Sequence, residues 1–269
     1  MDDAAEAEAA KPRRVIQGTP FGLYFADSDP AQRPSDVGVV IPTVLRPELT
    51  RALESVYAQD LDGRIQIAIG IDKSETTLDA LLARIARRPP NVSVLVLRLP
   101  YSTSSRHGGV HTARDGGALR SILTFMINSR YVAYLDDDNL YRPNHLSALL
   151  EAIKGKAWAA THRMLLDVET GAELGKDIWD SVGPGKGRIE GGFVDPNCLM
   201  VDKVKLAEMI GAWSSRPARQ TKSAPGDRNF FRRIREAPHV VLDQASVLYY
   251  VRRTNLLHRF IASNRPAFT

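Results

Sequence analysis

The stretch Tyr131-Val132-Ala133-Tyr134-Leu135-Asp136-Asp137-Asp138-Asn139 decides the fold of this 269-residue chain. Its first five residues form an apolar run, which is typical of a strand buried on both faces. Three consecutive carboxylates follow at the carboxyl end of that strand, where open α/β sheets bind their ligands. This placement favours a ligand site over the alternative, an acidic surface turn that caps the next helix.

The acidic triplet also predicts a cation. Neighbouring carboxylates repel one another, and Mg²⁺ or Mn²⁺ would relieve the repulsion through oxygen ligands while leaving positions for substrate phosphates. Because side chains alternate along an extended chain, we expect Asp136 and Asp138 to face one side and Asp137 another.

Strand and helix patterns alternate on the amino-terminal side of this stretch. Apolar runs predict strands over 37–41, 65–71 and 92–97, and helix spacing predicts helices over 47–57, 76–87 and 115–128. The alternation predicts an α/β fold with a mostly parallel sheet and helices on both faces. Residues 1–36 are rich in proline and charge and predict a partly disordered arm, part of which docks through its apolar residues, Phe21, Leu23, Tyr24 and Phe25.

The pattern loosens on the carboxyl-terminal side. Strands are predicted over 157–161, 193–201, 240–242 and 246–251, and helical segments over 202–210 and 229–235. These elements predict a smaller mixed sheet. The chain therefore divides into an arm (1–36), a first half (37–150) and a second half (151–269).

Composition restricts the class of protein. The net charge is +5, and the segment from Arg216 to the end holds eleven Lys and Arg against three Asp and Glu, which suits phosphates, an anionic membrane surface or a nucleic acid. No apolar run approaches the roughly 18 residues of a membrane span, and the acidic residues 1–6 lack the apolar segment of a secretory signal. Cys198, the single cysteine, excludes an internal disulfide and reads as a buried small hydrophobe. We expect a cytoplasmic protein.

Five segments, taken in order, resemble the family 2 glycosyltransferases of the GT-A fold. They span residues 37–234 and are Val39-Val40-Ile41-Pro42-Thr43 with Arg46-Pro47, Ile69-Gly70-Ile71-Asp72-Lys73-Ser74, Ala113-Arg114-Asp115-Gly116-Gly117, 131–139, and Gly226-Asp227-Arg228-Asn229-Phe230-Phe231-Arg232-Arg233-Ile234. The resemblance implies a Rossmann-like sheet in which 37–150 binds a nucleotide-sugar and 151–269 binds the acceptor.

The resemblance also implies roles for the donor-binding residues. Pro42, Thr43 and Arg46 would line the base and ribose, and Asp72 would accept hydrogen bonds from one of them. Arg114 would contact the diphosphate.

For the acidic loop the resemblance implies a metal site that takes Mn²⁺ or Mg²⁺. Asp138 is expected as the direct ligand, and Asp136 on the ribose or on the metal through water, with Asp137 beside them in the donor site. His258 is a further candidate ligand, although a surface or core histidine is the alternative reading.

Asp227 matches the catalytic base of the family. It would deprotonate an acceptor hydroxyl in a single displacement with inversion. Gly226 and Asn229 stand where the family has acidic residues. The arginines near Asp227 are expected to lower its pKa, which leaves retention of configuration open.

The expected partners are a nucleotide-sugar, with UDP as the base-rate choice, and a glycan, lipid-linked or small-molecule acceptor, as in polysaccharide biosynthesis. Contact with a membrane surface is compatible with the charge, and no nucleic acid is expected. A metal-dependent nucleotidyltransferase is the first alternative, but it would carry a glycine-rich loop after the first strand, and 41–47 has no glycine. A nucleic-acid binder is the second alternative. Such proteins usually interleave aromatic and basic residues, and the tyrosines and arginines of 249–259 do so only sparsely.

Overall fold

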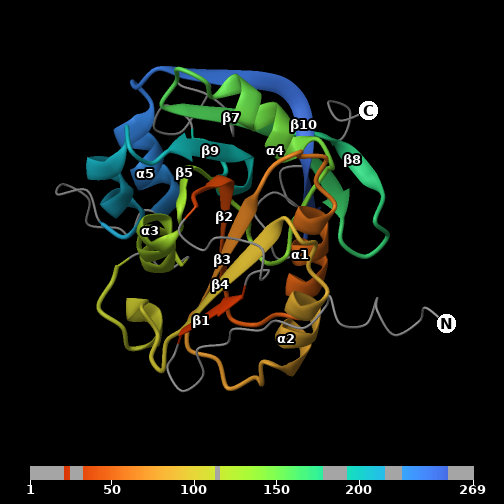
Figure 1. Ribbon diagram of the computed structural model, residues 1–269, viewed down its shortest axis with the longest axis vertical. Helices are drawn as coiled ribbons and strands as arrows, with labels where there is room; N and C mark the ends of the chain where they lie inside the picture. The colour runs from red at the N-terminus through yellow and green to blue at the C-terminus, as the bar shows by residue number, and fades with distance from the viewer. Residues whose placement is uncertain (1–20, 25–32, 113–115, 178–192, 216–225, 254–269) are drawn as a thin grey trace.

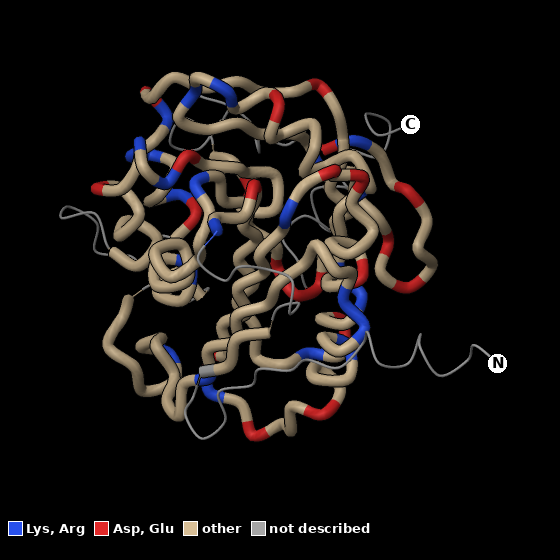
Figure 2. Tube along the Cα trace, viewed as in Figure 1, with Lys and Arg blue, Asp and Glu red and all other residues tan. Residues whose placement is uncertain are grey.

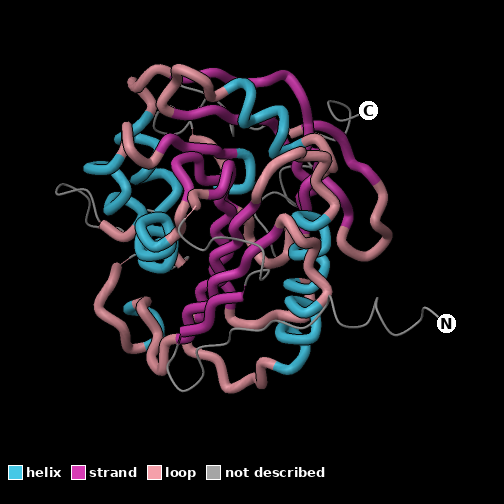
Figure 3. Tube along the Cα trace, in the orientation of Figure 1, coloured by secondary structure: helices cyan, strands magenta, loops and turns pink. Residues whose placement is uncertain are grey.

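The computed structural model of the chain describes residues 21–24, 33–112, 116–177, 193–215 and 226–253. Within these residues the strands form one ten-stranded sheet in the order β1-β4-β3-β2-β5-β9-β7-β10-β6, with β8 paired to β7. Helices flank the sheet on both faces (Figures 1 and 3). The predicted α/β class is confirmed.

The parallel part of the sheet comes from the first half of the chain. It consists of β2 (Ser35–Thr43), β3 (Ile65–Ile71), β4 (Val92–Arg98) and β5 (Ser129–Tyr134), which run parallel to one another. All seven residues of β3 are buried, as the continuous apolar run predicts.

Three helices cover this part of the sheet. They are α1 (Leu49–Tyr57) and α2 (Asp79–Ala86), which contact each other on one face, and α3 (Gly117–Met126), which packs on β2 and β3 from the other (Figure 1). α2 and α3 are shorter than the predicted helices. α3 ends where Ile127 adopts an extended conformation.

The strands of the second half continue the same sheet with mixed directions. β9 (Leu199–Asp202) runs antiparallel to both β5 and β7 (Trp158–Asp167), and β10 (His239–Val251) runs parallel to β7. The short strands β6 (Leu140–Tyr141) and β8 (Glu173–Lys176) pair antiparallel with β10 and β7. The remaining helices are α4 (His145–Ala152) and α5 (Gly226–Ile234).

Three of the second-half predictions were wrong in detail. The strand predicted over 193–201 is mostly loop with a 3-10 turn, η2 (Pro196–Cys198), because Pro196 and the side chain of Asp195 form that turn. The helix predicted over 202–210 is a turn followed by a 3-10 helix, η3 (Ala207–Trp213). The two late strands are one strand, β10, with irregular register between Val241 and Val247.

The arm docks as predicted where the structure describes it. β1 (Phe21–Tyr24) is an antiparallel edge strand on β4, and the ring of Tyr24 is buried. Residues 1–20 and 25–32 lie outside the described part of the chain.

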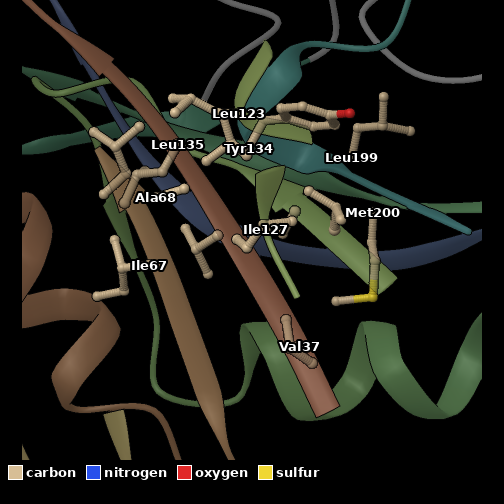
Figure 4. Packing of buried hydrophobic residues seen from close by; sticks show 14 of the residues in the cluster. Val37, Ile67, Ala68, Leu123, Ile127, Tyr134, Leu135, Leu199 and Met200 are labelled. Atoms are coloured by element: carbon tan, nitrogen blue, oxygen red, sulfur yellow. The ribbon is translucent and has the colours of Figure 1, made fainter. Parts of the chain in front are cut away.

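One hydrophobic cluster runs through both halves of the chain. Figure 4 shows Leu123 and Ile127 lying over the strands, with Leu199 and Met200 of β9 continuing the same packing. Cys198 is buried in this cluster, as predicted. None of the described helices has the length and hydropathy needed to cross a membrane.

Candidate active site

A cleft of about 410 Å³ lies where β2, β3 and β5 end at one edge of the sheet. It is lined by Pro42, Thr43, Val44, Arg46, Asp72, Ser104, Arg106, His107, Gly116, Leu119, Arg120, Asp136 and Asp137. Six of the predicted donor-binding residues are among them, because the carboxyl ends of parallel strands meet at one edge. Asp138 is not among the lining residues, but it pairs with one of them, Arg46.

Asp137 is the most deeply buried carboxylate of the acidic loop. Its side chain is 5% exposed, accepts a hydrogen bond from the hydroxyl of Thr43 at 2.7 Å and pairs with Arg46 at 3.1 Å. Burial raises the pKa of Asp137, and the bond from Thr43 opposes that rise. Asp137 therefore ties the acidic loop to the end of β2.

Asp138 lies between arginines and like charges. Its carboxylate is 3.1 Å from Arg46 and 3.2 Å from Arg252. Burial raises the pKa of Asp138 to about 6, with further upward contributions from Asp136 and Asp137 that the two arginines oppose. The side chain is still 24% exposed, so it remains open to a ligand.

Asp136 has partners of its own. Its two carboxylate oxygens contact Arg120 and the side-chain amide of Asn197, the latter at 2.9 Å. That Asp136 and Asp138 share a side stays a prediction: Asp138 shares Arg46 with Asp137, but Asp136 raises the pKa of Asp138 more than Asp137 does. The strand ends at Tyr134 and a turn follows, closed by Asn139 N–H and the carbonyl of Asp136 at 3.2 Å, so strand alternation does not reach Asp138.

Asp72, at the end of β3, holds the loop that follows β4. Its oxygens accept hydrogen bonds from the hydroxyl of Ser102 at 2.8 Å and from the backbone N–H of Thr103 at 2.7 Å. This loop contains the 3-10 turn η1 (Ser105–His107), and it brings Arg106 and His107 to the cleft.

Asp227 lies in the first turn of α5 and is not among the residues that line the cleft. Its carboxylate accepts a hydrogen bond from the N–H of Arg228 at 2.6 Å. Three residues after Asp227, the ring of Phe230 stacks on Trp213 and meets Tyr134 edge-on. The first turns of α5 thus pack beside β5, the strand that precedes the acidic loop.

The other predicted residues fall outside the described part of the chain or belong to the core. Arg114 and His258 are outside the described residues, as is Trp179. Trp158 and Trp213 are fully buried and belong to the core.

The carboxylates suit a hard cation, although the described residues contain no cluster of three or more His, Cys, Asp and Glu side chains that could enclose one. Asp136 and Asp138 supply oxygen ligands, which Mg²⁺ and Mn²⁺ prefer, and such ions commonly take their remaining ligands from water and phosphate. Burial and the two neighbouring carboxylates raise the pKa of Asp138, and a bound cation would offset both effects. The residues therefore fit a cation that the substrate helps to hold.

Several residues of the site were not predicted from the sequence: Ser104, Arg106, Arg120, Asn197 and Arg252. Arg120 had a detectable signal, because it occupies a buried position of α3 that the helix spacing assigns to apolar residues. Asn197 lay within a run read as a strand, and nothing local indicated its contact with Asp136. Figure 2 shows basic and acidic positions interspersed along the described trace, so net charge did not mark the site.

Known structures share this architecture. TarS of S. aureus, solved as residues 1–349 in complex with UDP-GlcNAc, superposes with a TM-score of 0.58 at 16% identity, over 82% of this chain and 60% of that one. The mannosyltransferase PcManGT of Pyrobaculum calidifontis, in complex with GDP-Man and Mn²⁺, gives 0.57 at 12% identity, over 90% of this chain and 64% of that one. The chain thus spans less than two thirds of the length of these structures.

The sequence comparisons give the family. No curated protein matches the chain in sequence. Residues 38–165, which run from within β2 into β7 and contain the acidic loop, match the family described as Glycosyl transferase family 2. Residues 38–165, just under half of the chain, therefore match a family 2 glycosyltransferase segment, and the fold is GT-A.

Proposed function

We propose that this chain transfers a sugar from a nucleoside diphosphate sugar, with UDP as the nucleotide, to the hydroxyl of an acceptor, assisted by Mn²⁺ or Mg²⁺. The observation that carries the proposal is the single cleft in which Asp72, Asp136 and Asp137 lie with Arg46, Arg106 and Arg120. Carboxylates accept hydrogen bonds from a nucleoside, and guanidinium groups bind phosphates. The donors in the two related structures are UDP-GlcNAc and GDP-Man.

The donor would occupy the cleft along the strand ends. Pro42, Thr43 and Asp72 would border the base and ribose at the ends of β2 and β3. Arg120 is buried, with its guanidinium between Asp136 and the ring of Trp213, so it can neutralise a diphosphate without a large loss of side-chain freedom. Arg114 is proposed for the diphosphate as well.

The cation would be held by Asp138, with Asp136 bound to it through water or to the ribose, and with His258 as a further candidate ligand. When bound, such an ion compensates the negative charge that develops on the leaving diphosphate. Arg46 and Arg252, which contact Asp138, hold its carboxylate at the edge of the cleft.

Asp227 is proposed as the base that takes the proton of the acceptor hydroxyl, with inversion at the anomeric carbon. The packing of Phe230 against Trp213 and Tyr134 supports this role, because it anchors α5 beside the acidic loop. The acceptor would bind on the side formed by 151–269 and would be a glycan, a lipid-linked glycan or a small molecule. For such acceptors we propose that the enzyme is cytoplasmic and contacts a membrane surface.

Thermal unfolding with nucleotides tests donor binding. UDP with Mn²⁺ should raise the melting temperature, because a ligand at about 100 times its Kd stabilises the native state by about 2.7 kcal/mol. GDP with Mn²⁺ is the matched comparison for the base, and Mn²⁺ without nucleotide is the control for the ion. Failure of both nucleotides to shift the transition would refute the proposal.

Asp227→Asn tests the base. The variant should bind UDP and Mn²⁺ as tightly as the wild type, while sugar transfer to an acceptor mixture falls by about 100-fold or more, the lower range of general-base contributions. The anomeric configuration of the wild-type product, read by NMR, tests inversion. Equal losses of UDP affinity and of transfer would exclude Asp227 as the base.

A further inference from the structure

Asn197 is a fully buried side chain that makes three hydrogen bonds around Asp136. Its amide oxygen accepts from the backbone N–H of Asp136 at 2.6 Å. Its amide nitrogen donates to the carboxylates of Asp136 at 2.9 Å and Asp195 at 2.7 Å. The contact joins η2 to the end of β5, 61 residues apart in the chain.

The orientation of this amide follows from its partners. A backbone N–H can be met only by the amide oxygen, and two carboxylates can be met only by the amide nitrogen. Aspartate at position 197 would instead direct a third carboxylate at Asp136 and Asp195. Asparagine is therefore the residue that satisfies all three groups.

A network of buried ion pairs holds Asp195, one of the partners of Asn197. Asp195 pairs with the buried guanidinium of Arg163 at 2.5 Å, and Arg163 also pairs with Asp177 at 2.5 Å. The guanidinium carbon of Arg163 lies 4.4 Å from the ring centroid of Tyr249. Because Asp195 is held in this way, it offers the amide of Asn197 an acceptor in a fixed position.

We propose that Asn197 is a positioning residue, which holds the Asp136 carboxylate in one orientation toward the donor and cation. The inference rests on the proposed function. Asp136 is 31% exposed and lies beside two other carboxylates that repel it. Without the donation from Asn197, Arg120 alone would hold this carboxylate, its second oxygen would lose its fixed partner, and the donor would lose a prepositioned acceptor.

A double-mutant cycle tests the inference, with the affinity for UDP in the presence of Mn²⁺ measured by calorimetry. Asn197→Ala should weaken binding by about 10- to 100-fold, the range found when a residue supporting a metal ligand is removed. In the Asp136→Asn background the same substitution should change the affinity less than about 2-fold, because residues that act through one another are not additive. Asn197→Ser is measured in both backgrounds too, in case the alanine variant unfolds.

Gln59→Ala is the matched control. Gln59 is an amide side chain with three hydrogen bonds, to the backbones of Ser55, Arg142 and Leu146, and it lies after α1, outside the cleft lining. Its loss should lower stability and leave UDP affinity unchanged.

The outcomes separate the two proposals. If the wild type binds neither UDP nor GDP, the proposed function fails and this inference fails with it. If the wild type binds, and Asn197→Ala or Asn197→Ser costs the same affinity in both backgrounds, the role of Asn197 is structural and only the inference is overturned.

Discussion

At the scale of single residues, Asp138 combines opposite electrostatic influences in one carboxylate. Two arginines contact it, yet burial and two neighbouring carboxylates raise its pKa to about 6. A raised pKa means that the native state disfavours the ionised carboxylate relative to the unfolded chain. The folded protein therefore carries a cost at neutral pH that a bound cation would offset.

The substitution Asp138→Asn separates this cost from function. Cation-dependent release of UDP from a UDP-sugar should fall by about 100-fold or more, since a direct ligand matters at least as much as its supporting residues. The free energy of unfolding at pH 7, measured in urea, should not decrease, because the neutral amide removes the like-charge repulsion. Asp243→Asn, at a highly exposed carboxylate on β10, is the control and should leave UDP release unchanged. Undiminished release by Asp138→Asn would remove this residue from the mechanism.

The sequence predicted some residues of the cleft and missed others for a physical reason. Thr43, Asp72 and Asp136 stand at the ends of apolar runs, and parallel pairing alone brings such ends together. Asn197 reaches Asp136 only because β9 lies beside β5, a pairing that no local pattern encodes.

At the scale of elements, the loop from Ser102 to His111 forms one wall of the cleft and depends on a glycine. A Cβ on Gly109 would lie 2.3 Å from the carbonyl oxygen of Ser102 and 2.4 Å from that of Thr103, which is closer than such atoms ever approach. The backbone must therefore move if a side chain is added. Asp72 fixes Ser102 and Thr103, so the displacement falls on the part of the loop with Arg106 and His107.

We therefore predict that Gly109→Ala weakens UDP binding and lowers the free energy of unfolding by about 1–3 kcal/mol, the usual cost of overpacking. Gly211→Ala is the matched control, since a Cβ there would meet nothing within 4 Å. Calorimetry with UDP and Mn²⁺, together with urea unfolding, measures both effects. Wild-type affinity in Gly109→Ala would show that this wall does not contact the nucleotide.

His145 joins α4 to β6 and β10 and makes their packing depend on pH. The buried ring stacks on Tyr141 at 3.9 Å between centroids, and its Nδ1 lies 2.8 Å from the hydroxyl of Ser246. Its Nε2 has no hydrogen-bond partner among the described residues. Burial lowers the pKa of His145 to about 3, so the native state holds it neutral.

The sign of the pH effect follows from this shift. Between about pH 6.5 and 3, this histidine binds a proton in the unfolded chain, where its pKa is about 6.5, but stays neutral in the native state. Protonation therefore favours the unfolded chain, and the free energy of unfolding falls as the pH falls from about 6.5 toward 3. The slope is about 1.4 kcal/mol per pH unit within that window. His145→Gln should remove this contribution between pH 6 and 5, whereas Ser246→Ala should lower stability and keep the slope. Urea titrations at several pH values measure the slope of the unfolding free energy against pH. An unchanged slope in His145→Gln would show that His145 does not cause this pH dependence.

Element boundaries were predictable where one face of an element is apolar and uniform. In α1, buried Leu49, Ala52, Leu53 and Val56 follow helix spacing, and the helix forms within the predicted range. η2 was missed because the side chain of Asp195 caps it, and η3 because it packs against α3 and α5; hydrophobic periodicity reports neither effect.

At the scale of the whole molecule, β9 connects the two halves of the chain. It lies between β5 of the first half and β7 of the second and pairs with both. The hydrophobic cluster likewise includes strands β2 to β5 together with β7, β9 and α5. The predicted division at residue 150 therefore falls within a continuous sheet and core, and we do not expect either half to unfold first.

Urea unfolding tests this cooperativity, because the chain carries its probes unevenly. All three tryptophans lie in the second half, at 158, 179 and 213, so their fluorescence reports on that half, while far-ultraviolet circular dichroism reports on both. The two midpoints should coincide, as they do when a protein unfolds in one step. UDP with Mn²⁺ should then shift both midpoints equally, although the proposed nucleotide site lies in the first half, because ligand binding stabilises the whole cooperative unit. A fluorescence midpoint that stays in place while the dichroism midpoint moves would show that the β5–β9 pairing does not couple the halves.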